Sequence, residues 1–497
     1  MAGMRPHFTL PLTQSRVRII ALRALLGGIS LAVATVACAD NDGDWIDAQL
    51  RKWQVPGVAI AIVRPGQAPV LLGRGFCDID KQVPCTADSP FSMGSTTKFV
   101  TGLVAATLAA EKKLSLDEPL INRWPEFRLS DPRWIEINLK DVLSQRSGLG
   151  SVDWPYFWDE TLTRQHYVGR VAFVPMAKPF RSGWRYANAN FVIAGAYLER
   201  VSGQSWEALV RERLLLPLAM THSGFEAPVG KTAGYVLDGN GAFARVPHLN
   251  TPAIGPAGSL VSTARDFSSL LQAVLDNGQW QGRQVLPASA VSTAIAPVIG
   301  TSYDRRSYEA PGGYGLGVFL ASYRNSTIVQ HSGGYGGYST HFALLPQRKI
   351  GVVVLANRTR SEFPHALALG LIDRALGMSG DEPLTRWFEP ATRKAPIKAA
   401  APALDPTRPL PLYAGKFRNA AWGVFEIYLA QGKLNIRYGS FEAPLDHYRY
   451  DNFSFESAPG WERLRLRFEA DAEGNVGGFS MDDEENAPMQ KFERVAP

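Results

Sequence analysis

The sequence contains little of what zinc-binding, multi-span membrane or nucleic-acid-binding proteins use. Only three of its 497 residues are cysteine, and they lack the paired spacing of zinc sites. Beyond the N-terminus, no apolar run approaches the roughly 18 residues that a membrane helix needs. Positive charge is also scarce, because four of the 52 basic residues lie in the first 39, which contain no Asp or Glu. Removing these four leaves 48 basic against 46 acidic residues, so no nucleic-acid partner is expected.

The N-terminus has the pattern of a secretory signal. Arginines precede an uncharged, mostly apolar stretch of 13 residues, 24–36, and residues 37–39 offer a small-residue cleavage site. We therefore predict a signal peptide over residues 1–39, a periplasmic or secreted protein, and no stable membrane span after cleavage. A lipoprotein anchored through Cys38 is the alternative, although Thr35 stands where a lipobox has an aliphatic residue.

Cleavage after residue 39 leaves two cysteines, Cys77 and Cys85. They bracket a short polar segment that is typical of a hairpin tip. In an oxidising compartment, an even pair so close together predicts a disulfide. Two free thiols in a polar loop are the other interpretation. Neither cysteine has the partners of a metal site, so we predict no metal.

The order of strand-like and helical segments predicts an α/β (α+β) fold for residues 40–390. Strand patterns at 58–63 and 70–72 return after residue 314, and helical periods dominate from about Ser95 to Leu270. This order favours an antiparallel sheet built from both ends of the domain, flanked by helices, with a helical region inserted. The later segments are strands at 314–320, 328–331, 342–345 and 351–355, and a helix near 365–376.

The end of the chain reads as a second, smaller domain. Residues 391–411 are rich in Ala and Pro, which prevents a continuous helix and predicts a linker. Residues 412–497 contain several short alternating runs separated by turns, a spacing that predicts a small β-barrel. The expected strands are 424–429, 434–438, 448–450, 453–455 and 464–468.

Ser95 and Lys98 form the most informative local pattern, Ser-x-x-Lys, at the start of an apolar helical segment. Residues three apart on a helix share a face, so the lysine amine can reach the serine hydroxyl. A serine hydroxyl is a weak nucleophile unless a neighbouring base accepts its proton, and a desolvated lysine can be that base. A lone match of this kind is more often a helix N-terminus capped by hydroxyl residues.

Two further patterns follow in order. Tyr186 and Asn188 form Tyr-x-Asn at the entry to another apolar helix. The tyrosine can exchange a proton with a leaving group, and the amide can hold a lysine and a substrate carbonyl. His331, Gly333 and Gly334 lie between two strand-like runs, where glycine permits close approach of a substrate and a backbone N–H can donate to an oxyanion.

Together, in this order, the three motifs resemble those of the penicillin-binding-protein and class C β-lactamase-like serine hydrolases. Supporting phrases extend over most of residues 45–375. One departure is Gln145, which stands where the family usually has histidine. Residues 412–497 resemble the lipocalin-like domain that often follows this hydrolase domain.

The resemblance implies an acyl-enzyme route with an active site in the cleft between the sheet and the helical region. Ser95 would be the nucleophile, Lys98 and Tyr186 would share proton transfer, and Asn188 would orient Lys98 and the substrate amide. The backbone N–H groups of Ser95 and Gly334 would form the oxyanion hole.

The same resemblance implies a small-molecule or short-peptide substrate, with an amide or peptide bond next to a D-residue, or a β-lactam. No cofactor is required. An esterase on the same scaffold and a non-catalytic ligand-binding or sensor protein are the alternatives. The aromatic residues between Trp154 and Trp158 fit either a substrate wall or ordinary loop packing.

His331 leads to a prediction about substrate choice, because the best-known β-lactamases carry lysine at this position. A neutral imidazole offers one hydrogen bond where an ammonium offers a fixed charge, and losing a charge-assisted bond typically removes about 1.5–3 kcal/mol. Matched substrates with a free carboxylate or an amide should therefore differ in kcat/KM by less than about 100-fold. His331→Lys should widen the preference for the acid. A much larger preference in the wild type would mean that another cation, such as Arg146 or Arg185, binds the carboxylate.

Overall fold

The computed structural model describes residues 42–228, 231–238, 240–248, 251–301, 312–387, 404–457, 463–482 and 489–495. The chain forms two compact units, one up to Lys52 and one from Trp53 onward, and residues 42–52 of the first are helical. The predicted signal peptide, the alternative Cys38 anchor and residues 391–403 of the predicted linker lie outside the described residues. No helix within the described ranges is long and apolar enough to cross a membrane.

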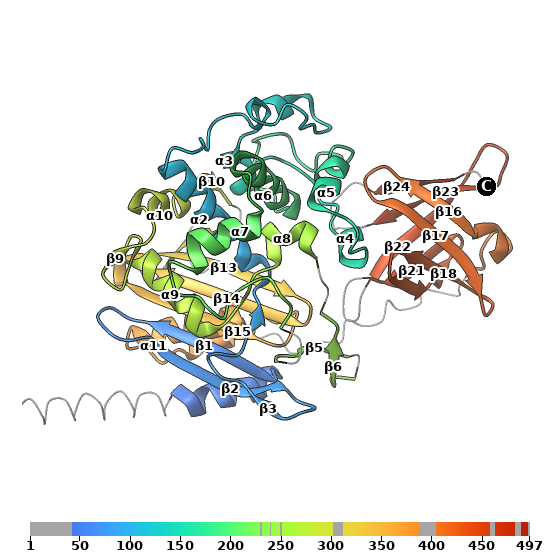
Figure 1. Cartoon of the computed structure of the whole chain (residues 1–497). Coiled ribbons are helices and arrows are strands. Elements are labelled where there is room, and N and C mark those ends of the chain that lie inside the picture. The colour runs from blue at the N-terminus through green and yellow to red at the C-terminus, as the bar shows by residue number, and fades with distance from the viewer. Residues whose placement is uncertain are drawn as a thin grey trace, which may run out of the picture. The chain divides into compact units, whose positions relative to one another are not determined.

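A nine-stranded antiparallel sheet forms the centre of the larger unit (Figure 1). Its order is β10-β11-β12-β13-β14-β15-β1-β2-β3, and Val58 of β1 lies opposite Ala356 of β15. The prediction of a sheet built from both ends of the domain is therefore confirmed. The strands are β1 (Gly57–Val63), β2 (Val70–Asp78), β3 (Val83–Pro84), β10 (Ile299–Gly300), β11 (Gly313–Tyr314), β12 (Phe319–Tyr323), β13 (Ser326–Tyr335), β14 (Tyr338–Leu345) and β15 (Ile350–Ala356).

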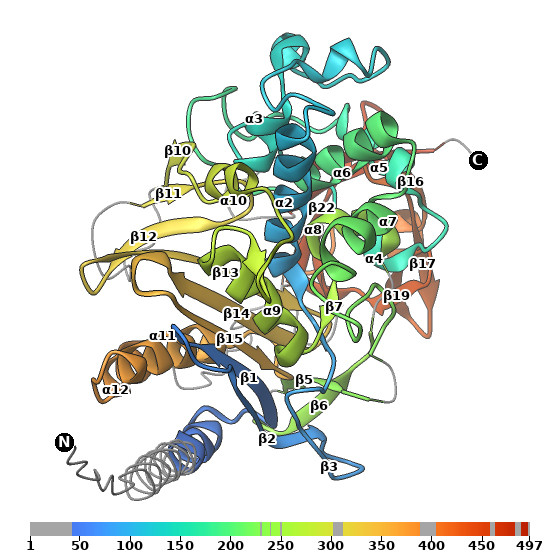
Figure 2. The same ribbon diagram turned by 60° about the vertical axis from the view of Figure 1, so that its left-hand side comes forward.

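Helices cover both faces of this sheet (Figure 2). Phe342 of β14 packs on Phe99 of α2 (Thr97–Ala110) and on Phe267 of α9 (Ala264–Leu275). The preceding residue, His341, stacks on His365 of α11 (Phe363–Ala375). Successive side chains of a strand point to opposite faces, so α2 and α9 lie on one face and α11 lies on the other. This two-sided cover explains why β1 and β15 are buried along their whole length.

The inserted region between β3 and β10 is mainly helical, as predicted. Its first helix, α2, is entered through the 3-10 turn η1 (Gly94–Thr96). Its other helices are α3 (Leu139–Leu143), α4 (Pro155–Trp158), α5 (Arg164–Val171), α6 (Asn188–Ser202), α7 (Trp206–Val210), α8 (Gly255–Gly258), α9 and α10 (Ala288–Ala294).

One predicted strand, 314–320, is wrong. The structure divides it between β11 and β12, which form an antiparallel pair, with Tyr314 opposite Phe319. The N–H of Gly315 donates to the carbonyl oxygen of Val318 at 2.9 Å, which closes a tight turn between them. An apolar run that contains a hairpin turn has the same composition as one continuous strand, so composition did not distinguish the two.

The C-terminal part is a nearly closed nine-stranded β-barrel with the order β19-β18-β17-β16-β24-β23-β22-β21-β20. The strands at the two ends of this order, β19 and β20, are consecutive in the chain and are separated only by Leu445. The sheet must therefore curl back on itself. The strands are β16 (Gly415–Asn419), β17 (Gly423–Ala430), β18 (Lys433–Tyr438), β19 (Phe441–Pro444), β20 (Asp446–Arg449), β21 (Asn452–Glu456), β22 (Arg463–Ala470), β23 (Val476–Asp482) and β24 (Gln490–Arg494).

A disulfide joins Cys77 in β2 to Cys85, just after β3. Both cysteines are buried. Since the bond closes a loop with a sequence separation of 8, it restricts the unfolded chain only moderately.

We expect replacement of both cysteines by serine to lower the free energy of unfolding by about 2.5 kcal/mol, the chain-entropy value for a loop of this size. Urea denaturation of wild type and double mutant measures the difference. Non-reducing peptide mapping of exported protein should recover Cys77 and Cys85 in one linked fragment. Two free thiols in freshly purified exported protein would contradict the prediction.

Candidate active site

Ser95 and Lys98 lie at the junction of η1 and α2, and their side chains meet. Ser95 is in the 3-10 turn, Lys98 is in the first turn of the helix, and Lys98 Nζ lies 2.9 Å from Ser95 Oγ. The contact expected from a spacing of three residues is therefore present.

The Lys98 amine is enclosed by acceptors from other helices. Its Nζ donates to Asn188 Oδ1 at 2.6 Å and to the carbonyl oxygen of Ala257 at 2.8 Å. Asn188 begins α6 and Ala257 lies in α8, so three helices meet at one nitrogen. The Lys98 side chain is fully buried.

Burial lowers the pKa of Lys98 to about 7, and the charge of Asp153 acts in the opposite direction. A neutral amine is therefore well populated near neutral pH. Such an amine has two N–H donors, which suit Asn188 Oδ1 and Ala257 O, and one lone pair. The lone pair is then free to accept the Ser95 hydroxyl proton.

Tyr186 approaches the same hydroxyl from another direction. Its O–H donates to Ser95 Oγ at 2.6 Å, and Lys98 Nζ lies 4.8 Å from the centre of its ring. Burial raises the pKa of Tyr186 well above its ordinary value, so the phenol is protonated at neutral pH. Ser95 thus has a base on one side and a proton donor on the other.

His331 lies beside these groups, but its ring nitrogens have partners within the protein. Nδ1 is 2.6 Å from the carbonyl oxygen of Ser332, which can only accept, so Nδ1 carries the proton. Nε2 then accepts from the Tyr314 hydroxyl at 3.1 Å. Burial lowers the pKa of His331 to about 3. The imidazole is neutral, and this pairing makes it a wall of the site more than a hydrogen-bonding ligand.

Glycines let strand β13 approach the nucleophile turn closely. Gly94 has a φ of +52°, and a Cβ on it would lie 2.7 Å from Gly334 N. A Cβ on Gly333 would lie 2.0 Å from the carbonyl oxygen of Met93. The backbone of Gly334 therefore lies against that of Gly94, the residue before Ser95.

A cavity of about 530 Å³ opens over Ser95. Of the predicted site residues, Ser95, Tyr186, His331, Gly333 and Gly334 line it. Lys98 and Asn188 lie beneath. The other residues that define its character are aromatic or charged: Trp184, Phe319, Tyr335, Arg360, Glu362 and His365.

Gln145, where the sequence departs from the resembled family, supports the Tyr-x-Asn segment. Its Oε1 accepts from the backbone N–H of Ala187 at 2.9 Å and from Asn190 Nδ2 at 2.6 Å. Ser147 in turn donates to Asn190 Oδ1 at 2.5 Å. The amide of Gln145 therefore fixes the backbone between Tyr186 and Asn188.

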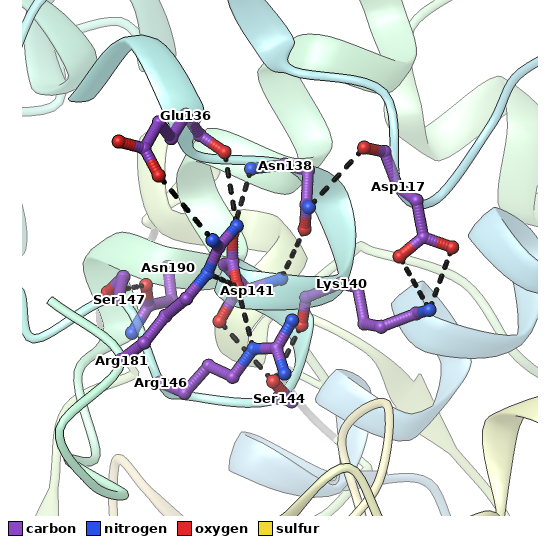
Figure 3. A network of polar contacts seen from close by, with 10 residues as sticks. All are labelled: Asp117, Glu136, Asn138, Lys140, Asp141, Ser144, Arg146, Ser147, Arg181 and Asn190. Atoms are coloured by element: carbon purple, nitrogen blue, oxygen red, sulfur yellow. Dashed lines mark hydrogen bonds and ion pairs between the residues drawn. The ribbon is translucent and has the colours of Figure 1, made fainter. Parts of the chain in front are cut away.

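A polar network around Asp141 anchors the segment that carries Gln145 (Figure 3). Asp141 is fully buried and accepts from Arg146 Nε at 2.6 Å and from a terminal nitrogen of Arg181 at 2.7 Å. Asp141 also forms a reciprocal cap with Asn138 at the start of α3. Arg146 is thus held away from the cavity, which does not favour the suggestion that it binds a substrate carboxylate.

The other aromatic and charged residues of the cavity wall were missed from the sequence, as were three groups that contact the predicted residues: the Ala257 carbonyl, Asp153 and Tyr314. A backbone carbonyl leaves no residue-type signal. Asp153 and Tyr314 reach the site only through the fold, since their partners Asn188 and His331 are 35 and 17 residues away. Asp153 Oδ2 accepts from Asn188 Nδ2 at 2.7 Å.

The aromatic residues at 154–158 do not line the cavity directly, but Phe157 packs against Tyr335, which does, with ring centres 6.3 Å apart. Among the described residues that line the cavity, none comes from this segment. Trp154 instead packs against aromatic residues of the C-terminal barrel, including Phe425 and Phe441, with ring centres 5.4 and 5.0 Å away.

Two family models together match most of the chain. The Beta-lactamase family model matches residues 44–376, and a domain of unknown function, DUF3471, matches 399–494. An unguisins hydrolase, ungD, from Aspergillus violaceofuscus is 26% identical over 462 residues, which cover 80% of this chain and 79% of the relative. Protein flp of Staphylococcus aureus is 26% identical over 329 residues, covering 64% and 63%.

Solved structures share the fold. A penicillin-binding protein homologue from Pyrococcus abyssi has a TM-score of 0.59 at 20% identity and covers 92% of this chain and 100% of its own. SurE gives 0.59 at 21% identity, with 93% and 100% covered. The D-amino acid amidase of Ochrobactrum anthropi SV3 gives 0.56 at 21% identity, with 70% and 97% covered.

The close contact at Gly333 predicts unequal effects of two neighbouring substitutions. In Gly333→Ala the new methyl group meets Met93 O, so the strand must shift, at a cost of about 1–3 kcal/mol. In Gly334→Ala the nearest atom is 3.8 Å away, and the backbone N–H is retained. The melting temperature and the rate of fluorophosphonate labelling should both fall for Gly333→Ala. Both should stay near the wild-type values for Gly334→Ala. Equal behaviour of the two variants would contradict this geometry.

Proposed function

Because the chain belongs to the Beta-lactamase family, we propose that it is an exported serine hydrolase that forms an acyl-enzyme on Ser95. The observation that carries this proposal is the position of one hydroxyl between two complementary groups. Ser95 Oγ lies 2.9 Å from the Lys98 amine and 2.6 Å from the Tyr186 hydroxyl, at the floor of a cavity.

Acylation begins with a proton transfer inside this triad. The neutral amine of Lys98 takes the hydroxyl proton as Ser95 Oγ bonds to the substrate carbonyl carbon. The negative charge moves to the carbonyl oxygen. The backbone N–H groups of Ser95 and Gly334 are the proposed donors to that oxygen. Loss of one such donor from an oxyanion hole typically costs about 2.7–4 kcal/mol of transition-state stabilisation.

Departure of the amine requires a proton on the leaving nitrogen. Tyr186 donates its phenolic proton to the leaving nitrogen, and the charge on Lys98 stabilises the resulting phenolate until Lys98 returns its proton to Tyr186. The phenolate is therefore always paired with a positive charge. An unpaired phenolate would be costly, because the pKa of Tyr186 is raised by burial. In deacylation, Lys98 takes a proton from water as the water oxygen bonds to the acyl carbon. The bond to Ser95 Oγ then breaks, Ser95 Oγ recovers a proton from Lys98 or through Tyr186, and the acid is released.

The proposed substrate is an amide or peptide with an apolar or aromatic group beside the scissile bond. The name of the solved D-amino acid amidase favours the D configuration for that residue. Trp184, Phe319 and Tyr335 supply apolar surface to the cavity. One relative is named a hydrolase of unguisins and one solved structure is a D-amino acid amidase; both names favour an amide substrate.

A free carboxylate on the substrate has little positive charge to meet. Arg360 is the one Lys or Arg among the described residues that line the cavity, and Glu362 lines it too. With His331 neutral, the positive charge of Arg360 and the negative charge of Glu362 balance one another on the cavity wall. This agrees with the expectation of a weak preference for acids over amides.

We predict that a fluorophosphonate probe adds once to the protein and that Ser95→Ala abolishes the adduct. The reason is that, among the serines the structure describes, Ser95 alone combines a cavity position with contacts to Lys98 and Tyr186. Intact-mass spectrometry and peptide mapping measure it. Ser147→Ala and Ser332→Ala serve as matched controls and should keep the adduct. An adduct mapped to either of these serines would overturn the assignment.

The substrate class is tested on the same preparation with D-aminoacyl amides, their L-enantiomers, short acyl esters and nitrocefin. Turnover of the D-amides supports the proposal. Turnover of the esters alone would identify an esterase on the same scaffold. Labelling of Ser95 without turnover of any of these would favour a ligand sensor.

A further inference from the structure

Asp153 is a partly buried acidic group that the mechanism above does not use. It precedes α4, and its carboxylate has two strong donors. Oδ2 accepts from Asn188 Nδ2 at 2.7 Å, and Oδ1 accepts from the Tyr167 hydroxyl at 2.5 Å. The Tyr167 side chain, from α5, is fully buried. The carboxylate is therefore held in one orientation behind the catalytic lysine.

This carboxylate determines which way the Asn188 amide faces. An amide has one acceptor and two donors. Because Asp153 can only accept when it is ionised, it holds the NH₂ group of Asn188, and the oxygen must turn toward Lys98, where it lies 2.6 Å from Nζ. A reversed amide would direct its own N–H at the amine and displace it from Ser95.

Asp153 also faces Lys98 electrostatically. Desolvation raises the pKa of the Asp153 carboxyl, whereas the hydrogen bonds from Tyr167 and Asn188 and the charge of Lys98 favour its ionised form. The titratable groups packed around the two are Tyr186 and His331 on the Lys98 side, and Tyr156 and Tyr167 on the Asp153 side. Burial raises the pKa of each tyrosine and lowers that of the histidine, so all four are neutral near neutral pH. Removing the Asp153 charge should then lower the pKa of Lys98 further.

The residue after Asp153 lies inside the aromatic cluster of the C-terminal barrel. Trp154 is buried, and its ring centre lies 5.4 Å from that of Phe425, 5.7 Å from that of Tyr438 and 5.0 Å from that of Phe441. These partners come from β17, β18 and β19. A side chain enclosed by three strands of one barrel fixes the backbone that carries it.

Polar contacts beside Trp154 join the same two parts of the chain. The N–H and the hydroxyl of Ser440 donate to the carbonyl oxygen of Trp158 at 2.8 and 2.9 Å. A terminal nitrogen of Arg170 donates to the Tyr438 hydroxyl at 3.2 Å. The segment 153–158 is thus attached to the barrel by ring packing at Trp154 and by hydrogen bonds at Trp158.

We infer that Asp153 is a positioning residue for Asn188 and Lys98, and that the C-terminal barrel holds it there by packing around Trp154. The inference rests on the proposed acyl-enzyme function. It gives the barrel a part in catalysis although the described cavity-lining residues all precede residue 366.

Fluorophosphonate labelling of Ser95 as a function of pH separates the two effects of Asp153. Asp153→Asn keeps an acceptor for Asn188 but removes the charge, so the acidic limb of the rate profile should move to lower pH. Asp153→Ala also removes the acceptor, so its rate on the alkaline plateau should fall about tenfold or more, the size of a lost charge-assisted hydrogen bond. Asp159→Asn is the matched control, because Asp159 accepts from Thr161 in the same loop, and its profile should match wild type.

The barrel is tested from both sides of the contact. Trp154→Ala, and independently Phe441→Ala, should lower the plateau rate as Asp153→Ala does, and Trp154→Phe should restore most of it. Phe479→Leu is the control within the barrel, since Phe479 packs on Phe417, Phe468 and Phe492. Melting curves recorded on each variant show whether it is folded, and the Phe441 variant decides the matter if Trp154→Ala does not fold.

The outcomes are distinct. If the wild type is not labelled at Ser95, the proposed function fails. If the wild type is labelled but Asp153→Asn has an unchanged or alkaline-shifted limb, the role of Asp153 is wrong. If both barrel-contact variants are folded and keep the wild-type rate, the barrel does not hold Asp153.

Discussion

The buried amine of Lys98 is the constraint on which the site depends. A lysine without exposed surface must have its nitrogen satisfied by the protein. Here a side-chain amide, a backbone carbonyl and a serine hydroxyl, from α6, α8 and η1, surround it. Placing three such groups around one atom requires η1, α2, α6 and α8 to pack closely together. The same burial brings the pKa of the amine to about 7, where it can serve as a base.

Of Lys98, Tyr186 and His331, the lysine is the residue whose charge changes near neutral pH. Burial keeps the neighbouring tyrosine and histidine neutral. Gln145 fixes the backbone between Tyr186 and Asn188. Asp153 faces the amine from the other side, next to Trp154, which packs among the aromatic residues of the barrel. The site is therefore a product of both parts of the larger unit, with the nucleophile on one side of the lysine and the anchored carboxylate on the other.

Local spacing made part of this predictable. Ser95 and Lys98 are three residues apart at a helix start, so their contact follows from helix geometry alone. The acceptor at Ala257 and the carboxylate of Asp153 depend on packing between distant segments, for which a single sequence carries no signal. His331 was predicted beside the site, but its pairing with Tyr314 could not be. The sheet followed from strand order, whereas the turn within 314–320 and short, polar or glycine-containing barrel strands such as β16 and β23 did not.

The most direct test of this account is an NMR titration of the Lys98 side chain, with lysine labelled with ¹⁵N at Nζ and the resonance assigned from its absence in Lys98→Met. A midpoint near pH 7 is expected for this amine, while exposed lysines titrate at about 10.4. A Lys98 resonance that titrates with the exposed lysines would show that the amine is protonated at neutral pH. It would contradict the assignment of Lys98 as the base that activates Ser95.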